Sequence, residues 1–177
     1  MLDPKDGAIL ALVSYPTFDP AKVAQADPEA LRDRSIAWTY EPGSTMKAVT
    51  VSGAIDQRVV TPSTTYNDVG YAVIGGRRLN NALGKAWGPT TVRQVLERSL
   101  NAGAAFIASR LGAEKLHDYL GRFGFGVPTG VDLAGEQTGT VRPLAEWYPV
   151  DLGTASFGQG LSATPLQVAA AYAAIAN

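Results

Sequence analysis

The sequence predicts one domain in which helices outweigh strands. The chain has 177 residues, 46% of them hydrophobic and 18% charged, a length and balance typical of a globular domain with a buried core. Helix-capping signals combined with apolar periodicity are concentrated after Thr90. A short apolar run near the N-terminus, bounded by turn residues, predicts some β structure. No internal repeat, low-complexity segment or second domain is visible.

In the first half of the chain we predict one strand, two helices and a loop region. Asp3–Gly7 has the residue types of a turn, and the apolar run Ala8–Ser14 after it predicts a buried strand with a short hairpin partner upstream. Asp27–Glu29 combines a cap with a first-turn proline and predicts a helix start. A second helix is predicted over Ser44–Ile55, after a Pro-Gly pair. The segment 61–88 is rich in Gly, Asn and Thr and predicts loop with short strands.

The second half is mainly helical, after a short strand predicted at Tyr71–Ile74. Thr91–Gln94 fits a capping box, and the helix that follows has an apolar stripe of Val92, Val95, Leu96 and Leu100. Helices predicted at Ala102–Leu111 and Ala113–Phe123 are separated by a glycine. A long glycine-rich loop then leads to the final helix, which Thr164–Gln167 starts with a cap, a proline and a capping-box glutamine.

Charge and residue types exclude several classes of function. The net charge is -1 and no basic block is present, which argues against nucleic acid and an anionic membrane surface as main partners. The chain has no cysteine, so disulfides, thiol catalysis and cysteine-ligated metals are excluded. Its most apolar stretch, Val168–Ala176, is too short to cross a bilayer. We expect any export signal or membrane anchor to lie outside these residues.

Ser44 and Lys47 form the first candidate catalytic pair. Ser44 is the only serine followed three residues later by a lysine, and residues at that spacing share a helix face. A buried, neutral amine there could take the proton of the hydroxyl. The N-terminus of the helix would favour an alkoxide and supply one backbone N–H for an oxyanion. The alternative is an ordinary helix cap followed by a solvated lysine, since so short a motif also occurs by chance.

Ser99 and Asn101 form the second candidate pair, in the only Ser-x-Asn of the chain. A serine hydroxyl can relay a proton between a base and a leaving group. An asparagine amide can both donate to a substrate carbonyl and accept from an amine. The alternative is a helix C-cap, where asparagine is common.

Ordered stretches along almost the whole chain match one known family. They are Leu2–Ala11, Ser14–Pro20, Tyr40–Lys47, Leu96–Asn101, Phe123–Gly126, Gly135–Gly139, Ser156–Gly160 and Thr164–Gln167. With these stretches the chain resembles the transpeptidase domain of penicillin-binding proteins, in particular the monofunctional class B enzymes. The Ser-Leu-Asn form of the motif is also common in the bifunctional class A enzymes, so the choice between class A and class B stays open.

The resemblance implies a role for each of the four candidate residues. Ser44 would attack the penultimate D-Ala of a peptidoglycan stem peptide, with Lys47 as general base, Ser99 as proton relay and Asn101 as a substrate-binding amide. An amine of a neighbouring stem peptide would then resolve the acyl-enzyme and form a cross-link. β-Lactams would mimic the D-Ala-D-Ala end and acylate Ser44. No metal or other cofactor is implied. The family works at the extracytoplasmic face of the bacterial cytoplasmic membrane, so we expect a membrane-anchored protein in a cell-wall complex.

The resemblance also implies an α+β fold, with an antiparallel sheet and a large helical lobe. The family has a Lys-Thr/Ser-Gly strand after the Thr-Pro-Leu-Gln helix, and residues 1–177 contain no such motif. That strand would supply the second oxyanion N–H and the cradle for the substrate carboxylate. We therefore expect residues 1–177 to be a partial domain, mostly the helical lobe with an incomplete sheet. Such a fragment is expected to be inactive alone and to self-associate through uncovered edges and faces. A smaller departure is Met46, where the family often has Phe.

Two alternative functions remain open, and several conspicuous residues are assigned structural roles. The fragment could be a catalytically inert structural or binding piece, or the protein could be a β-lactamase or β-lactam sensor of the same fold, against which Ser-Leu-Asn argues. His117 is predicted to be a surface residue of an amphipathic helix rather than part of a Ser-His-Asp triad. Glu136 is expected to shape its loop rather than to act as a hydrolytic base. The tryptophans are expected to pack rather than to form a ligand platform; they are Trp38, Trp87 and Trp147.

Overall fold

Seven α-helices and four short strands make up the regular structure of the computed structural model, which describes all 177 residues. The α-helices are α1 (Arg34–Ala37), α2 (Met46–Asp56), α3 (Val92–Glu97), α4 (Asn101–Leu111), α5 (Ala113–Arg122), α6 (Asp151–Ala155) and α7 (Pro165–Ala176). The strands are β1 (Thr65–Asp68), β2 (Tyr71–Ile74), β3 (Arg77–Asn80) and β4 (Gly88–Thr91). Short 3₁₀-helices are η1 (Pro20–Gln25), η2 (Pro28–Leu31), η3 (Gly43–Thr45), η4 (Ala82–Gly84) and η5 (Leu144–Glu146).

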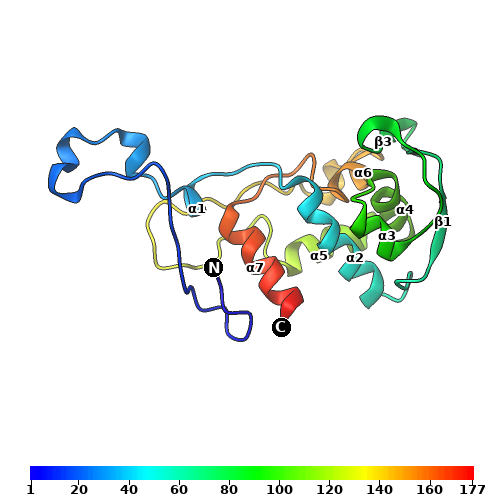
Figure 1. Cartoon of the computed structure of the whole chain (residues 1–177), viewed down its shortest axis with the longest axis horizontal. Helices are drawn as coiled ribbons and strands as arrows, with labels where there is room; N and C mark the ends of the chain where they lie inside the picture. The colour runs from blue at the N-terminus through cyan, green and yellow to red at the C-terminus, as the bar shows by residue number, and fades with distance from the viewer.

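The strands form two separate antiparallel pairs rather than one sheet. Strand β1 pairs with β4, with Thr65 opposite Thr91, and β2 pairs with β3, with Tyr71 opposite Asn80. Figure 1 shows the strands at one end of an elongated molecule, beside α3, α4 and α6. The residues before α1 form an extended arm: the segment with η1 and η2 reaches the other end, and the N-terminus lies nearer the middle, beside α7 (Figure 1). No residue before Ile36 is buried, so the arm adds nothing to the core.

The core is centred on α4, which packs against α2, α5 and α6. Its sequence, NAGAAFIASRL, consists mainly of small residues, and these allow neighbouring helices to approach closely. Nineteen buried apolar side chains form one cluster, which includes Met46 and Val49 of α2 and Leu116 and Leu120 of α5. This cluster fixes α2 against α4. Those two helices carry Lys47 and Asn101, and the two candidate serines lie just before them.

Gly103 of α4 provides a test of how tightly this core is packed. A Cβ at Gly103 would lie 2.3 Å from Cγ2 of Val95 and 2.8 Å from the hydroxyl oxygen of Tyr66. We therefore expect Gly103→Ala to lower the free energy of unfolding by about 1–3 kcal/mol, as other overpacked cores do. Chemical denaturation followed by circular dichroism measures it.

The matched control is Gly121→Ala in α5, because a Cβ at Gly121 meets no atom within 4 Å. Replacing an exposed helical glycine with alanine is expected to stabilise the chain by about 0.5–1 kcal/mol. If the two variants had the same unfolding free energy, the close approach at Gly103 would be contradicted.

Several local predictions are confirmed. Thr91 and Thr164 cap α3 and α7 with complete capping boxes. Gly112 separates α4 from α5 with φ +88°, a conformation that glycine adopts readily. The predicted strand at Tyr71–Ile74 is β2. The predicted helix over Ser44–Ile55 is η3 followed by α2. In each case the signal lies within a few residues of the structure it specifies.

The predicted buried strand over Ala8–Ser14 is wrong. The turn before it forms, because the Asp3 N–H donates to the Ala8 carbonyl at 2.9 Å and Leu2 pairs with Ile9 in an isolated bridge. Beyond that bridge the run has no strand partner, and Val13 is 85% exposed. Strand geometry needs a neighbouring segment to satisfy its N–H and C=O groups, and only the first residues of the chain supply one.

Two smaller predictions also differ from the structure. Asp27 does cap a helix start, but the helix is the single 3₁₀ turn η2. Leu96 is 43% exposed, although the other residues of its predicted stripe are buried. Helix α3 has only six residues, too few to present the stripe along one continuous face.

Candidate active site

Ser44 lies on η3, directly before α2. Gly43 adopts φ +58°, and its N–H donates to the Gly158 carbonyl at 3.0 Å. The Ser44 side chain is exposed, and its backbone N–H has no acceptor within the chain. The turn therefore presents a hydroxyl and a free N–H together at the beginning of a helix, where negative charge is favoured.

Lys47 is buried one turn after Ser44, and only 2% of it is exposed. Its Nζ lies 2.9 Å from Oγ of Ser44 and 3.0 Å from Oγ of Ser99. It also lies 2.8 Å from the Ser99 carbonyl oxygen and 2.8 Å from Oδ1 of Asn101. Burial lowers the pKa of the Lys47 amine from 10.5 to about 8, because desolvation disfavours the charged form. A neutral amine is therefore accessible near neutral pH.

Ser99 and Asn101 reach the same point from the junction of α3 and α4. Ser99 adopts φ +54°, an uncommon conformation for a residue other than glycine, and its Oγ donates to Oγ of Ser44 at 2.9 Å. Asn101 is the first residue of α4, one residue earlier than predicted, so the alternative of a C-cap is wrong. Its Nδ2 donates to the Asn80 carbonyl at 3.0 Å, which turns Oδ1 toward Lys47.

Counting protons at Lys47 shows how the neutral amine could act as a base. A neutral amine has two N–H groups and one lone pair. The Ser99 carbonyl and Oδ1 of Asn101 can only accept, and they match the two N–H groups. The lone pair is then left for the hydroxyl of Ser44 or Ser99. The arrangement can take the Ser44 proton directly or through the Ser99 hydroxyl.

Further residues, which the sequence analysis did not single out, hold the Ser44 turn in place. Oε1 of Glu41 accepts from the Gly160 N–H at 2.9 Å. The hydroxyl of Tyr172 in α7 donates to the Thr45 carbonyl at 3.0 Å. Both contacts join the turn to segments far away in sequence. No local pattern could have revealed them.

His117 and Glu136 lie outside this cluster. His117 is half-buried rather than a plain surface residue, because its ring packs edge-on against Trp147 and its Nε2 lies 3.0 Å from the Arg142 carbonyl. Glu136 accepts hydrogen bonds from Thr129 and from the Gly130 N–H. Slight desolvation raises the pKa of the Glu136 carboxyl. The hydrogen bonds lower that pKa by a larger amount, so its net shift is downward. Glu136 thus ties its own loop together.

The tryptophans differ from one another in burial. Trp147 packs against the core, as predicted. The packing prediction is wrong for Trp38 and Trp87, which are 49% and 38% exposed. The guanidinium of Arg34 lies 4.5 Å from the centre of the Trp38 ring. Nζ of Lys85 lies 3.8 Å from the centre of the Trp87 ring. Cations, rather than apolar neighbours, cover these two rings.

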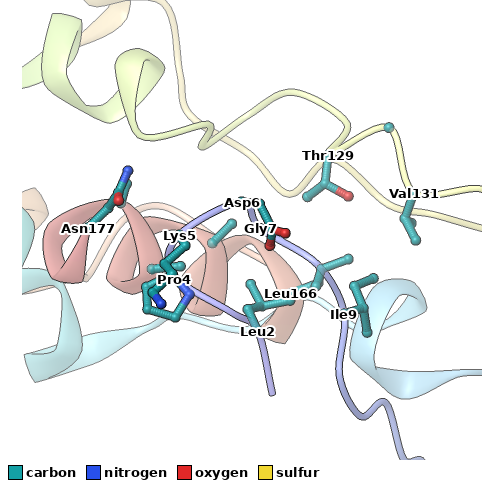
Figure 2. A pocket seen from close by; sticks show the side chains of 14 residues that line it. Leu2, Pro4, Lys5, Asp6, Gly7, Ile9, Thr129, Val131, Leu166 and Asn177 are labelled. Carbon is teal, nitrogen blue, oxygen red and sulfur yellow. The ribbon is translucent and has the colours of Figure 1, made fainter.

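A pocket of about 520 Å³ lies away from the four candidate residues. Figure 2 shows it between the N-terminal turn, α7 and the loop at Thr129–Val131. None of the four candidate residues lines it. No group of side chains suited to a metal ion is present in the structure, and none of the helices has the length and apolar character needed to span a membrane.

One protein-family model matches the whole chain. It is described as the penicillin binding protein transpeptidase domain and matches residues 1–177. The chain belongs to this family. Stage V sporulation protein D of Bacillus subtilis is 42% identical over 178 residues, which are 99% of this chain and 28% of that protein. Peptidoglycan D,D-transpeptidase FtsI of Escherichia coli is 33% identical over 177 residues, which are 100% of this chain and 30% of that protein.

A solved structure of the family agrees with the fold. Penicillin binding protein 3 from Mycobacterium tuberculosis, complexed with aztreonam, matches with a TM-score of 0.78 and 34% identity, over 83% of this chain and 33% of that one. The α+β class with an incomplete sheet is thereby confirmed, as is the resemblance to penicillin-binding transpeptidases. The chain spans less than a third of the length of the curated relatives named above.

Proposed function

We propose that the protein containing this chain is a serine D-Ala-D-Ala transpeptidase that cross-links peptidoglycan and is acylated by β-lactams. One observation carries the proposal: Nζ of Lys47 lies within 3.0 Å of a side-chain oxygen of Ser44, Ser99 and Asn101. A buried amine among hydroxyl and amide oxygens is the arrangement that activates a serine nucleophile. The family description and the printed name of the Escherichia coli relative support the reaction class.

Acylation would proceed from the neutral form of Lys47. The Ser44 oxygen attacks the carbonyl carbon of the penultimate D-Ala while Lys47 takes the hydroxyl proton. The Ser44 N–H and the N-terminus of α2 stabilise the oxyanion. The C–N bond then breaks, and Ser99 passes the proton to the departing amine of the terminal D-Ala. Asn101 presents its amide to the substrate. The product is an ester on Ser44.

Deacylation would use the same residues in reverse. The amine of a second stem peptide attacks the Ser44 ester, the C–O bond breaks and Ser44 regains its proton. A new amide bond joins the two stem peptides. With a β-lactam the broken C–N bond belongs to a ring, so the amine stays attached to the acyl group. It does not depart as the terminal D-Ala does.

We further propose that residues 1–177 are a partial domain that is inactive alone and is acylated barely or not at all. Within the chain the Ser44 N–H is a free backbone donor at the nucleophile, and the family resemblance implies that the second oxyanion N–H comes from the Lys-Thr/Ser-Gly strand. Losing one oxyanion donor costs about 10²–10³ in rate. The two curated relatives are more than three times as long as the matched region, which leaves room for other parts of the protein to complete the site. The alternative is that the fragment is a catalytically inert structural or binding piece.

Location and partners follow from the proposed substrate. Peptidoglycan lies outside the cytoplasmic membrane, so we propose that the protein is anchored there, facing outward, in a cell-wall complex. The isolated chain is proposed to self-associate through the exposed arm, where Leu10, Val13 and Tyr15 are 60%, 85% and 81% exposed. Sedimentation velocity at high concentration tests this: a clean monomer would contradict it.

Labelling with a fluorescent penicillin tests the proposed function. The natural full-length protein, the 177-residue chain and a chain extended beyond Asn177 are each incubated with the penicillin, and peptide mapping by mass spectrometry locates the adduct. We expect stoichiometric labelling of Ser44 in the full-length and extended proteins and little or no labelling of the 177-residue chain. An adduct on another residue, or none in the full-length protein, would contradict the proposal. Sustained penicillin hydrolysis would favour a β-lactamase instead.

A further inference from the structure

We propose that Asp68 and Asn81 are positioning residues, which fix the amide orientation of Asn101 and thereby the atom that Asn101 turns toward Lys47. The inference rests on the proposed function. Neither residue touches Ser44 or Lys47. They lie at the ends of β1 and β3, beside the N-terminus of α4.

Asp68 is a buried carboxylate without a cationic partner. It is 1% exposed and forms no ion pair. Its oxygens accept from Nδ2 of Asn81 at 3.0 and 2.9 Å, and from the N–H groups of Gly70 and Trp87, both at 3.2 Å. A buried charge is costly unless it is well hydrogen-bonded, so these donors are held firmly in place.

The carboxylate decides which way the Asn81 amide points. Because a carboxylate only accepts hydrogen bonds, the NH₂ group of Asn81 must face Asp68. The Lys85 carbonyl accepts from the same NH₂ group at 3.1 Å. Oδ1 of Asn81 therefore faces the opposite way, where it accepts from the Ala102 N–H at 2.9 Å. That N–H belongs to the first turn of α4, directly after Asn101.

The side-chain amide of Asn101 is oriented by the peptide group between Asn80 and Asn81. The Asn81 N–H donates to the Gly70 carbonyl at 2.9 Å, which holds the Asn80–Asn81 peptide group. The Asn80 carbonyl can then accept from Nδ2 of Asn101 at 3.0 Å. Oδ1 of Asn101 is left facing Nζ of Lys47 at 2.8 Å. Two asparagines with fixed polarity thus connect a buried carboxylate to the general base.

A reversed Asn101 amide would change the chemistry at Lys47. Its NH₂ group would point at the amine and offer a proton to the lone pair that should receive the Ser44 proton. The base would then be partly occupied, and acylation would slow without loss of the nucleophile. A reversed amide would also change the group that Asn101 presents to the substrate, but the larger effect is expected on the rate of the bond-forming step.

The test measures penicillin acylation of the natural full-length protein carrying Asp68→Asn. Gly70 and Trp87 donate to different oxygens of Asp68, so the new amide can accept from only one of them. Its NH₂ group replaces the other oxygen and faces the NH₂ group of Asn81. We expect the acylation rate constant at saturating penicillin to fall about tenfold, as for other residues that orient a reacting group indirectly. The half-saturating concentration should change little. Asp151→Asn is the matched control, because that carboxylate also accepts hydrogen bonds from a backbone N–H and from an arginine but from no group of α4. This variant should keep the wild-type rate constant.

The double variant Asp68→Asn with Asn81→Asp separates orientation from stability. The exchanged pair can still hydrogen-bond, and the carboxylate at position 81 still accepts from Ala102, but the Lys85 carbonyl loses its donor. We expect part of the lost rate to return. A merely structural role would lower the fraction of protein that can be labelled but leave the rate constant of the labelled fraction unchanged, and the swap would restore no rate.

The outcomes distinguish this inference from the proposed function. If wild-type Ser44 is acylated and Asp68→Asn reacts at the wild-type rate, the positioning role is overturned and the transpeptidase proposal stands. If wild-type Ser44 is not acylated, the proposed function fails. Positioning is then judged by NMR of the Asn101 side-chain amide: signals shifted by Asp68→Asn and restored by the swap support it, and signals unchanged by Asp68→Asn overturn it.

Discussion

Replacing Ser44 with alanine is expected to abolish covalent labelling of the full-length protein by a fluorescent penicillin. The substitution removes the only oxygen in the cluster that is both exposed and next to a free backbone N–H. Ser99 has a hydroxyl within 3.0 Å of Lys47 as well, but its backbone N–H already donates to the Leu96 carbonyl at 3.2 Å and is not free to stabilise an oxyanion. Loss of a nucleophile costs about 10⁶ in rate in a comparable serine enzyme, so the labelled band should fall below detection.

The control for this prediction is Ser63→Ala, an exposed serine in the loop before β1. It should be labelled like the wild type. Circular dichroism of Ser44→Ala should show the wild-type helix content, because the Ser44 side chain is exposed and packs against no core residue. Persistent labelling of a folded Ser44→Ala protein would show that another residue is the nucleophile.

Replacing Lys47 is expected to produce the second largest loss. Lys47→Met keeps an unbranched side chain of similar length in the buried site but has no basic nitrogen. General base catalysis contributes about 10²–10⁴ in rate, and the acylation rate constant should fall by that factor. Lys47→Arg should be as slow, because a guanidinium stays protonated and cannot act as a base.

The pH dependence of acylation provides an independent check on Lys47. Its pKa is lowered to about 8, and the neutral form is the base. The wild-type rate constant should therefore rise about tenfold per pH unit below that value and level off above it. Lys47→Met should show no such rise. A wild-type profile that is flat between about pH 6 and 8 would contradict the assignment of the base.

The same shift in pKa links stability to pH. Between about pH 8 and 10.5 the unfolded chain holds a proton on Lys47 that the folded chain has released. The free energy of unfolding should therefore rise with pH through this window. It loses this contribution as the pH falls through the folded pKa. Denaturation of wild type and Lys47→Met side by side isolates the contribution of this one residue.

Local signals predicted most helix starts, because a cap acts on groups only two or three residues away. Thr91 and Thr164 are examples: each side chain accepts the third N–H of the helix that it begins. The strand predicted over Ala8–Ser14 failed for the opposite reason, whereas the one at Tyr71–Ile74 was confirmed. Ala8–Ser14 has the composition of a strand, but its hydrogen bonds depend on a neighbouring segment. The residues of Ala8–Ser14 alone cannot reveal whether such a neighbouring segment lies beside them.

In the candidate site, too, local spacing could be predicted from the sequence and contacts between distant segments could not. The sequence by itself determined that Ser44 and Lys47 share one face of a helix, since a spacing of three residues places them there. Ser99 and Asn101 could be nominated by residue type. Only the tertiary structure decided that both meet Lys47 across more than fifty residues of chain. It also decided that Asp68 and Asn81 stand behind Asn101. Hydrogen bonds between distant elements exist only once packing has fixed those elements in place, and in this chain the packing of α4 against α2 does so.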